Sequence, residues 1–281
     1  MAAGNLTGPT RALGASLDVF SGSTGIGANS ALLGKLGNNL IGGLDANNNA
    51  VLGADCNRSS NCTSLFDTRW KNAVAYISPN LSGFTLTAAY VANENKAADN
   101  VAALNTKGYD VGANYSNGPI TAGITYNAAS LGNAVDTKAN DLRIGGSYNF
   151  GVASLRLVYD RVKAENVALG GDELKQNVWG IGGTYNVTAN GKLVAQYYKA
   201  SDLKGSVALG AGADTGAKLF ALGYEHSLSK RTLLKATYSR LSNDNNASYD
   251  YGINAVGING AAGAANGAAL SGFQVGVRHS F

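Results

Sequence analysis

Fixed charges alternate with apolar residues in several stretches of this chain, and these charges are the residues that could do chemistry. In one stretch Asp141 and Arg143 alternate with Leu142 and Ile144. Successive side chains of a β-strand point to opposite faces, so the pattern predicts a charged face backed by an apolar one. Fixed charges that face water in a narrow passage select ions by sign. The charged positions predicted to share such a face are Arg69, Lys71, Asp141, Arg143, Arg156, Asp160, Glu225, Lys235 and Arg278.

Cations outnumber carboxylates in this set, which favours a water-filled passage with a mild preference for anions, because low-dielectric walls focus the field of the charges. The alternative is that the charges only keep the face wet and give no net preference. We expect neutral replacements of Arg143 and Arg156 to move the reversal potential of the full-length protein towards cations. An unchanged reversal potential would remove both residues from the selectivity argument.

Catalytic groups are not arranged for an enzyme. The two histidines, His226 and His279, fall on predicted apolar faces near strand ends, and neither has a Ser or Cys in a nucleophile turn nearby. Asp172 and Glu173 are adjacent carboxylates in a long connection, which is more typical of a solvated acidic patch. We therefore expect no catalytic site and no cofactor.

The only two cysteines, Cys56 and Cys62, lie close together in a polar stretch. Two such cysteines can close a small loop in an oxidising compartment, and we favour a surface-loop disulfide over two free thiols. A metal site would need further Cys or His at ligand spacing, and none is near. We expect no metal.

The composition argues against membrane helices and against nucleic-acid binding. Charged residues make up 14% of the 281 residues, against about 25% in an ordinary soluble domain. No apolar run approaches the roughly 20 residues of a spanning helix, so helical insertion is excluded. The net charge of +4 is not concentrated in a run, so no nucleic-acid partner is expected.

Alternation predicts eleven strands from residue 69 onward. Most are near the 9 to 11 or so residues of a tilted membrane-spanning strand. Tight turns such as 117–119 alternate with long connections such as 201–216, which is typical of an outer-membrane β-barrel with short turns on one rim and long loops on the other. The expected strands are 69–78, 84–92, 107–116, 120–128, 139–149, 153–163, 174–187, 192–200, 217–228, 232–241 and 271–281.

Residues 1–68 contain no convincing strand pattern and are expected to form a long loop region, followed by the barrel strands of 69–281. Eleven antiparallel strands cannot close without a parallel seam, and an open sheet would expose unpaired backbone groups to lipid. We therefore expect an odd number of strands before residue 69, and we interpret the chain as the carboxyl-terminal part of a larger barrel.

The chain resembles the general diffusion porins of the Gram-negative outer membrane, in the branch found in Neisseria, Bordetella, Burkholderia and Comamonas relatives. The resemblance rests on residues 72–84 (NAVAYISPNLSGF), 115–119 (YSNGP), 146–153 (GSYNFGVA), 222–232 (LGYEHSLSKRT) and 276–281 (GVRHSF). It implies an all-β fold with a sixteen-stranded transmembrane barrel, a homotrimer, contact with outer-membrane lipid and lipopolysaccharide, and passive diffusion of small hydrophilic solutes and ions.

The resemblance also implies roles for two segments. Gln274, Gly276, His279 and Phe281 resemble the signal that the barrel assembly machinery recognises in the terminal strand, with His279 in place of a bulkier group. Residues 17–27 resemble the start of the loop that folds into the pore and narrows it, which makes Asp18 a candidate constriction residue.

Two other classes remain as alternatives. An autotransporter translocator barrel or a surface adhesin would also end in Phe, although residues 1–68 lack the amphipathic helix that an autotransporter passes through its pore. Single-channel conductance separates these from a porin. A soluble β-sandwich is the third class, and partition into detergent rather than buffer excludes it.

Overall fold

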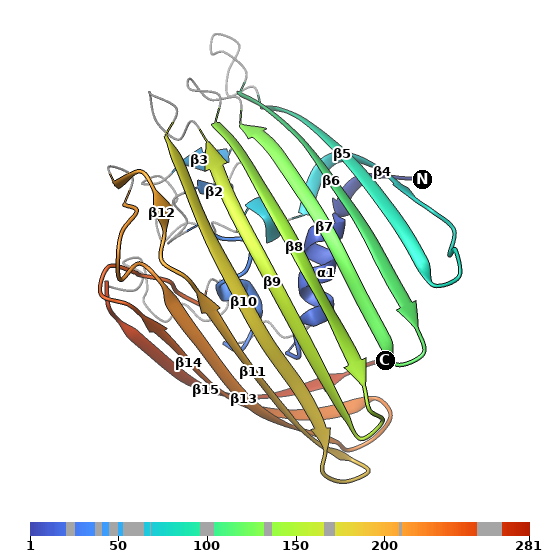
Figure 1. The fold of residues 1–281 in the computed structure, drawn as a ribbon. Coiled ribbons are helices and arrows are strands. Elements are labelled where there is room, and N and C mark those ends of the chain that lie inside the picture. The colour runs from blue at the N-terminus through green and yellow to red at the C-terminus, as the bar shows by residue number, and fades with distance from the viewer. Residues whose placement is uncertain are drawn as a thin grey trace.

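One large antiparallel sheet curves around an inner segment of the chain (Figure 1). The computed structural model describes residues 1–20, 26–36, 41–44, 50–52, 65–67, 69–95, 104–131, 137–165, 172–207, 210–251 and 266–281. In these residues the main sheet has thirteen strands. Twelve follow the order β1-β4-β5-β6-β7-β8-β9-β10-β11-β13-β14-β15, and β12 pairs with β10.

The strands of the main sheet are β1 (Ala2–Thr7), β4 (Arg69–Ile77), β5 (Phe84–Asn95), β6 (Leu104–Asn117), β7 (Ile120–Leu131), β8 (Thr137–Asn149), β9 (Ala153–Glu165), β10 (Glu173–Asn186), β11 (Gly191–Ala200), β12 (Lys204–Gly205), β13 (Ala217–Ser227), β14 (Thr232–Asn243) and β15 (Ala269–His279). All eleven strands expected from the sequence are confirmed, with ends that differ by a few residues. Each pairs with the next along the chain, as expected for hairpins joined by alternating short and long connections.

The amino-terminal part differs from the expected long loop. Ala2–Thr7 forms β1, which pairs antiparallel with β4 in the register Ala2↔Ala75 to Thr7↔Arg69. Alternation failed to predict this strand because its sequence, AAGNLT, carries only one large apolar residue and its register shifts between Gly4 and Leu6. Within the described residues β1 is the strand of the main sheet that precedes residue 69, and β1 and β15 are the two edges of this sheet.

The two faces of the sheet differ as the alternation predicted. On β9, Leu157 and Tyr159 point outward and are 52% and 40% exposed, whereas Val158 and Asp160 point inward and are buried. The same alternation continues across the neighbouring strands. The outward face therefore presents a broad apolar surface, which suits contact with lipid.

The inner segment, by which we mean residues 8–20 and 26–36, lies on the concave side of the sheet. It begins with the helix α1 (Pro9–Leu17), whose first residue is a proline, and continues through the short 3-10 helix η1 (Asn29–Ala31). Leu13, Leu17, Leu32 and Leu33 of this segment are buried against inward side chains of the sheet. A small sheet of β2 (Ile41–Leu44) and β3 (Ala50–Leu52) and the 3-10 helix η3 (Leu65–Asp67) follow.

Inward-facing glycines let α1 approach the sheet. A Cβ atom at Gly112 of β6 would lie 2.7 Å from Pro9 Cβ, and one at Gly123 of β7 would lie 2.8 Å from Leu13 Cδ1. At Gly145 of β8 it would lie 2.2 Å from Leu17 Cδ1. Pro9, Leu13 and Leu17 are spaced by four residues, so one helix face rests on three adjacent strands. Among the helices of the described residues, none is long and apolar enough to cross a membrane.

Candidate functional site

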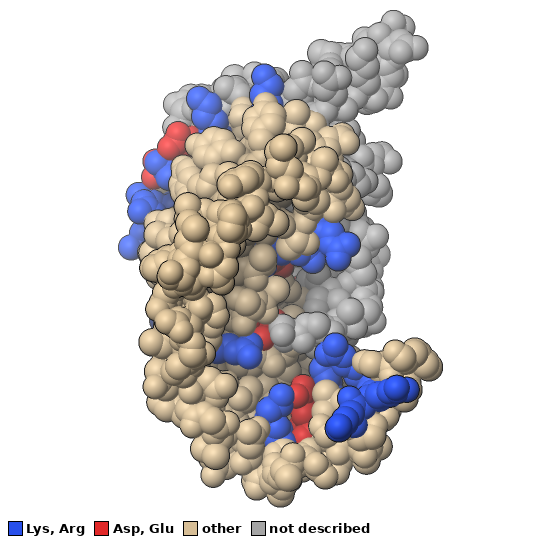
Figure 2. Space-filling model, turned by 90° about the vertical axis from the view of Figure 1, so that its right-hand side faces the viewer, with Lys and Arg blue, Asp and Glu red and all other residues tan. Residues whose placement is uncertain are grey.

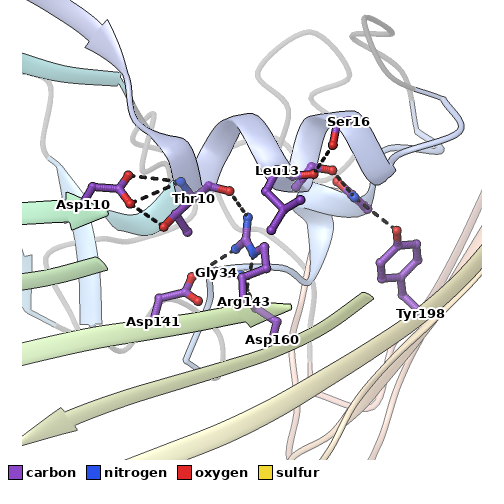
Figure 3. A network of polar contacts seen from close by, with 11 residues as sticks. Thr10, Leu13, Ser16, Gly34, Asp110, Asp141, Arg143, Asp160 and Tyr198 are labelled. Carbon is purple, nitrogen blue, oxygen red and sulfur yellow. Dashed lines mark hydrogen bonds and ion pairs between the residues drawn. The ribbon is translucent and has the colours of Figure 1, made fainter. Parts of the chain in front are cut away.

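Arg143 on β8 joins the sheet to the start of the inner segment (Figure 3). Its Nε donates to Asp160 Oδ1 at 2.8 Å, its Nη2 to Asp141 Oδ2 at 3.0 Å and its Nη1 to the carbonyl oxygen of Thr10 at 3.0 Å. The Arg143 side chain and both carboxylates are fully buried. Asp160 also accepts a hydrogen bond from the backbone N of Gly34, so this cluster ties both ends of the inner segment to the sheet.

A second contact holds the first turn of α1. The hydroxyl of Thr10 donates to Asp110 Oδ1 at 2.6 Å, and the backbone N of Thr10 lies 3.2 Å from both carboxylate oxygens of Asp110. A carboxylate at the amino-terminal turn of a helix accepts from otherwise unpaired N–H groups and complements the helix dipole. Asp110 on β6 was not among the residues predicted for the site.

Arg156 on β9 holds the other end of α1. Its Nη1 donates to the carbonyl oxygens of Ser16 at 3.1 Å and Asp18 at 2.7 Å. Carbonyl groups at a helix carboxyl terminus lack partners within the helix, and a guanidinium satisfies them while complementing the dipole. Arg156 therefore faces the inner side of the sheet, as its alternation predicted.

Asp18 is buried rather than exposed in a passage. Its Oδ1 accepts from the backbone N of Phe20 at 2.8 Å, and its Oδ2 accepts from the backbone N of Asn29 at 3.0 Å. Burial raises the pKa of the Asp18 carboxyl, and these backbone hydrogen bonds oppose the shift. The Asp18 side chain thus links residues 18–20 to Asn29 within the inner segment, a role that the sequence resemblance did not predict.

Polar side chains of β11 complete the inner contact. Gln196 donates through Nε2 to the carbonyl oxygen of Gly27 and accepts at Oε1 from the backbone N of Val19. Asn29 donates to the hydroxyl oxygen of Tyr198 at 3.2 Å. Sequence reasoning missed these residues, although Gln196 and Tyr198 lie on the polar side of a strand that it predicted.

A charged cluster lies on the inner face near the short turns. Glu225 on β13 is directly opposite Lys192 on β11 and Lys235 on β14 in the strand register. The Nζ atoms of Lys192 and Lys235 lie 2.8 Å and 3.4 Å from the Glu225 carboxylate. Arg278 of β15 is at an inward-facing position in the alternation of its strand, which we call inward parity, and its side chain is exposed. Figure 2, a view into the concave side, shows Lys and Arg side chains along this wall.

The first predicted cations lie differently. Trp70 is buried in the same inner cluster as Leu36, so its side chain points inward. Its neighbour Arg69, which is exposed, therefore points outward. The positive φ of 52° at Asn72, beside the register shift of β1 against β4, interrupts the alternation here. The side chain of Lys71 lies outside the described part of the structure, as do Cys56 and Cys62.

Two further ionisable groups, Lys35 of the inner segment and Asp67 of η3, are buried outside the strands. Burial lowers the pKa of the Lys35 amine to about 8, and the neighbouring carboxylates of Asp67 and Asp250 oppose this shift. Burial also raises the pKa of the Asp67 carboxyl, while the nearby Arg143, Arg11 and Lys35 oppose the shift. Arg11 of α1 donates to the backbone carbonyl of Asp67. The contact between Arg11 and Asp67 links α1 to η3.

The terminal strand presents the predicted assembly residues on two faces. Gln274 and Gly276 have inward parity, whereas His279 and Phe281 have outward parity. His279 Nδ1 lies 2.9 Å from Thr232 Oγ1, and its ring lies 4.9 Å from that of Phe281. Phe281 is fully exposed at the end of the chain.

The main sheet has an apolar outward face, a polar inward face and a segment folded against its concave side. These features are typical of outer-membrane β-barrel proteins. The family model described as Gram-negative porin matches residues 2–246, and the chain belongs to this family. Porins are channels and not enzymes, in agreement with the expectation from the sequence. Family membership places the chain in the outer membrane of a Gram-negative bacterium.

Relatives and solved structures agree with this assignment. Outer membrane porin protein 32 of Delftia acidovorans is 31% identical over 217 residues, which cover 76% of this chain and 57% of the relative. An outer membrane porin protein of Bordetella pertussis is 29% identical and covers 64% of this chain and 54% of its own length. The chain thus spans just over half the length of these two relatives.

The fold matches the anion-selective porin from Comamonas acidovorans with a TM-score of 0.74 and 26% identity, over 99% of this chain and 73% of that chain. OmpT of Vibrio cholerae matches with a TM-score of 0.61 and 15% identity, over 99% of this chain and 74% of that chain, which shows likeness of fold alone.

Proposed function

We propose that this chain forms the wall of a water-filled channel through which small hydrophilic solutes and ions diffuse passively across the outer membrane. The observation that carries the proposal is the two-faced sheet: the outward face is apolar, whereas the concave face carries charges and an anchored inner segment. A closed barrel of this kind encloses a polar lumen. The inner segment, together with the sheet, narrows that lumen.

The channel prefers anions mildly. Arg143 contributes little to the preference, because two carboxylates offset its charge in a fully buried cluster. The charges that act on ions in the lumen are Arg156, Lys192, Lys235 and Arg278. The carboxylate of Glu225, which pairs with Lys192 and Lys235, opposes them. Support comes from the Comamonas acidovorans porin of similar fold, which is described as anion-selective.

The partners follow from the same function. Three copies assemble into a homotrimer, the long loops face the outside of the cell, and the short turns face the periplasm. The barrel assembly machinery recognises the terminal strand through Gln274, Gly276, His279 and Phe281. Outer-membrane lipid and lipopolysaccharide surround the outward face.

Planar-bilayer recording tests the proposal. Protein extracted from outer membranes is inserted into a bilayer with a salt gradient, and stepwise conductance with an anion-directed reversal potential is expected. The double variant Lys192→Gln/Lys235→Gln leaves Glu225 without its two cations, so the reversal potential should move towards cations. The control Lys107→Gln/Lys138→Gln removes the same charge from exposed positions of β6 and β8 that have outward parity. Absence of steps contradicts the channel, and equal shifts in both double variants contradict the assignment of selectivity to the inner face.

A further inference from the structure

Three buried oxygen atoms on the inner face of the sheet have no hydrogen-bond partner in the part of the chain that the structure describes. They are Thr125 Oγ1 and Asn127 Oδ1 of β7 and Asp141 Oδ1 of β8, and Asn127 Nδ2 lacks a partner as well. All three side chains are 1% exposed or less. Because buried polar atoms are nearly always satisfied, a group of unpaired ones indicates a bound ion or water.

The strand register places these side chains next to one another. Asn127 is directly opposite Asp110 of β6 on one side and Asp141 of β8 on the other, and Thr125 lies two residues along β7 on the same face. The Asn127 amide is close enough to Asp110 to stabilise its carboxylate, although the two form no hydrogen bond of normal geometry. Only the amide nitrogen can donate to a carboxylate, so the amide oxygen is left for another partner.

Apolar residues cover this polar row on the side of the long loops. The next inward row holds only small residues, which are directly opposite one another on β6, β7, β8 and β9: Gly108, Ala129, Ala139 and Ala164. Ala129, Ala139 and Ala164 belong to the same buried cluster as Leu36 and Trp70. These residues provide no polar side-chain atom that could satisfy the row.

The charges around the row do not balance. Arg143 already donates from all three of its guanidinium nitrogens, and both oxygens of Asp160 already accept hydrogen bonds. A net negative charge buried without compensation is unfavourable. The ionisable groups that interact here comprise five carboxylates and three cations: Asp67, Asp110, Asp141, Asp160 and Asp250 against Arg11, Lys35 and Arg143.

We propose that Thr125, Asn127 and Asp141, together with the Asp110 carboxylate, bind one calcium ion beneath the first turn of α1. Calcium takes about six to eight oxygen ligands from carboxylates, amide carbonyls and water. A water molecule alone would satisfy the unpaired oxygens but not the negative charge, whereas a divalent cation does both. Among the described residues no three His, Cys, Asp or Glu side chains form a metal cluster, so this site also needs the amide and hydroxyl oxygens.

The position of the ion connects it to the inner segment. Asp110 accepts from the hydroxyl of Thr10, and Asp141 accepts from Arg143, which in turn donates to the carbonyl oxygen of Thr10. The proposed ion lies between these two contacts in the strand register. It would therefore hold in place the two carboxylates that fix the start of α1.

Metal analysis by mass spectrometry tests the site. Protein extracted from outer membranes is passed over a gel-filtration column in calcium-free detergent buffer, and the wild type should retain about one calcium ion per chain. Asn127→Leu should retain little, because loss of a ligand oxygen weakens metal affinity by about tenfold or more. Asn140→Leu is the matched control, since Asn140 is the outward, half-buried residue next to Asp141 on β8, and it should retain as much calcium as the wild type.

Terbium luminescence locates the ion without changing any ligand. The chain has two tryptophans: Trp70 is buried and, like Asp110, lies against Gly8, whereas Trp179 is on the outward face. Protein refolded in detergent with Tb³⁺ and excited through tryptophan should emit. The emission should disappear in Trp70→Phe and in an excess of Ca²⁺, and it should persist in Trp179→Phe.

Equal calcium contents of the wild type and Asn127→Leu would overturn the proposal. Wild-type protein that holds no calcium after refolding in its presence would also overturn it, because protons or water would then satisfy the row. Terbium emission that persists in Trp70→Phe would place the ion elsewhere in the molecule and contradict the site. The site does not depend on ion flow through the channel, so each of these results leaves the proposed function standing.

Discussion

At the scale of single residues, Arg143 is the side chain on which the position of the inner segment depends most. It is fully buried, and it donates to Asp141, Asp160 and the backbone of Thr10. The alternation of β8 and β9 predicted that these charges share a face. It could not predict their contact with Thr10, because 133 residues separate Thr10 from Arg143 and no local pattern links them.

We predict that Arg143→Met lowers the free energy of unfolding by about 3 to 5 kcal/mol, because it leaves two buried carboxylates without their cation. Chemical denaturation in detergent measures this change. Arg143→Lys should retain part of the stability, since it keeps the charge but loses the forked geometry. The control Arg231→Met, in an exposed turn, should change stability by about 0.5 kcal/mol or less. Similar losses for both Met variants would exclude a special role for Arg143.

We predict that the burial of Lys35 makes the free energy of unfolding increase with pH. Its pKa is about 8 in the folded protein because of burial, against 10.5 for the unfolded chain. Between these values the unfolded state binds more protons, so the free energy of unfolding should rise with pH, by about 3 kcal/mol in total. Urea denaturation of the wild type and of Lys35→Met from pH 7 to pH 10.5 measures the difference. If both proteins show the same slope in this window, Lys35 is not the group responsible.

At the scale of elements, the packing of α1 depends on the absence of side chains on three neighbouring strands. Gly112, Gly123 and Gly145 receive Pro9, Leu13 and Leu17. The sequence showed glycines inside strands, but not their partner, because α1 lies in a stretch interpreted as loop. Strands with strong alternation could be predicted from residue 69 to the end, whereas β1, with its irregular register and small residues, could not.

We predict that Gly123→Val displaces α1 from the sheet, because even its Cβ would lie 2.8 Å from Leu13 Cδ1. Overpacking of this kind costs about 1 to 3 kcal/mol. Proteolysis of the folded protein in detergent should then cleave the inner segment faster than in the wild type. Ala122→Val is the matched control, because Ala122 is the adjacent outward and exposed residue of β7. Faster cleavage in the control, or none in Gly123→Val, would contradict the packing account.

At the scale of the whole molecule, the alternating pattern of the sequence was enough to predict a sheet with one apolar and one polar face. Leu142 and Ile144 face outward, and Asp141 and Arg143 face inward, as predicted. The pattern could not distinguish charged residues that face the lumen from charged residues that bind the inner segment. That distinction depends on which inward residues lie beneath the segment, and therefore on contacts between distant parts of the chain.

The central claim is that the concave face meets water and the outward face meets lipid, and neighbouring residues of β11 test it most directly. The Lys192 side chain is 40% exposed on the inner side, and Leu193 is 41% exposed on the outer side. Lys192→Cys and Leu193→Cys are each prepared with Cys56 and Cys62 replaced by Ser, inserted into lipid vesicles and treated with a charged, membrane-impermeant thiol reagent. We expect rapid modification at position 192 and almost none at position 193. Equal modification at both positions would contradict it.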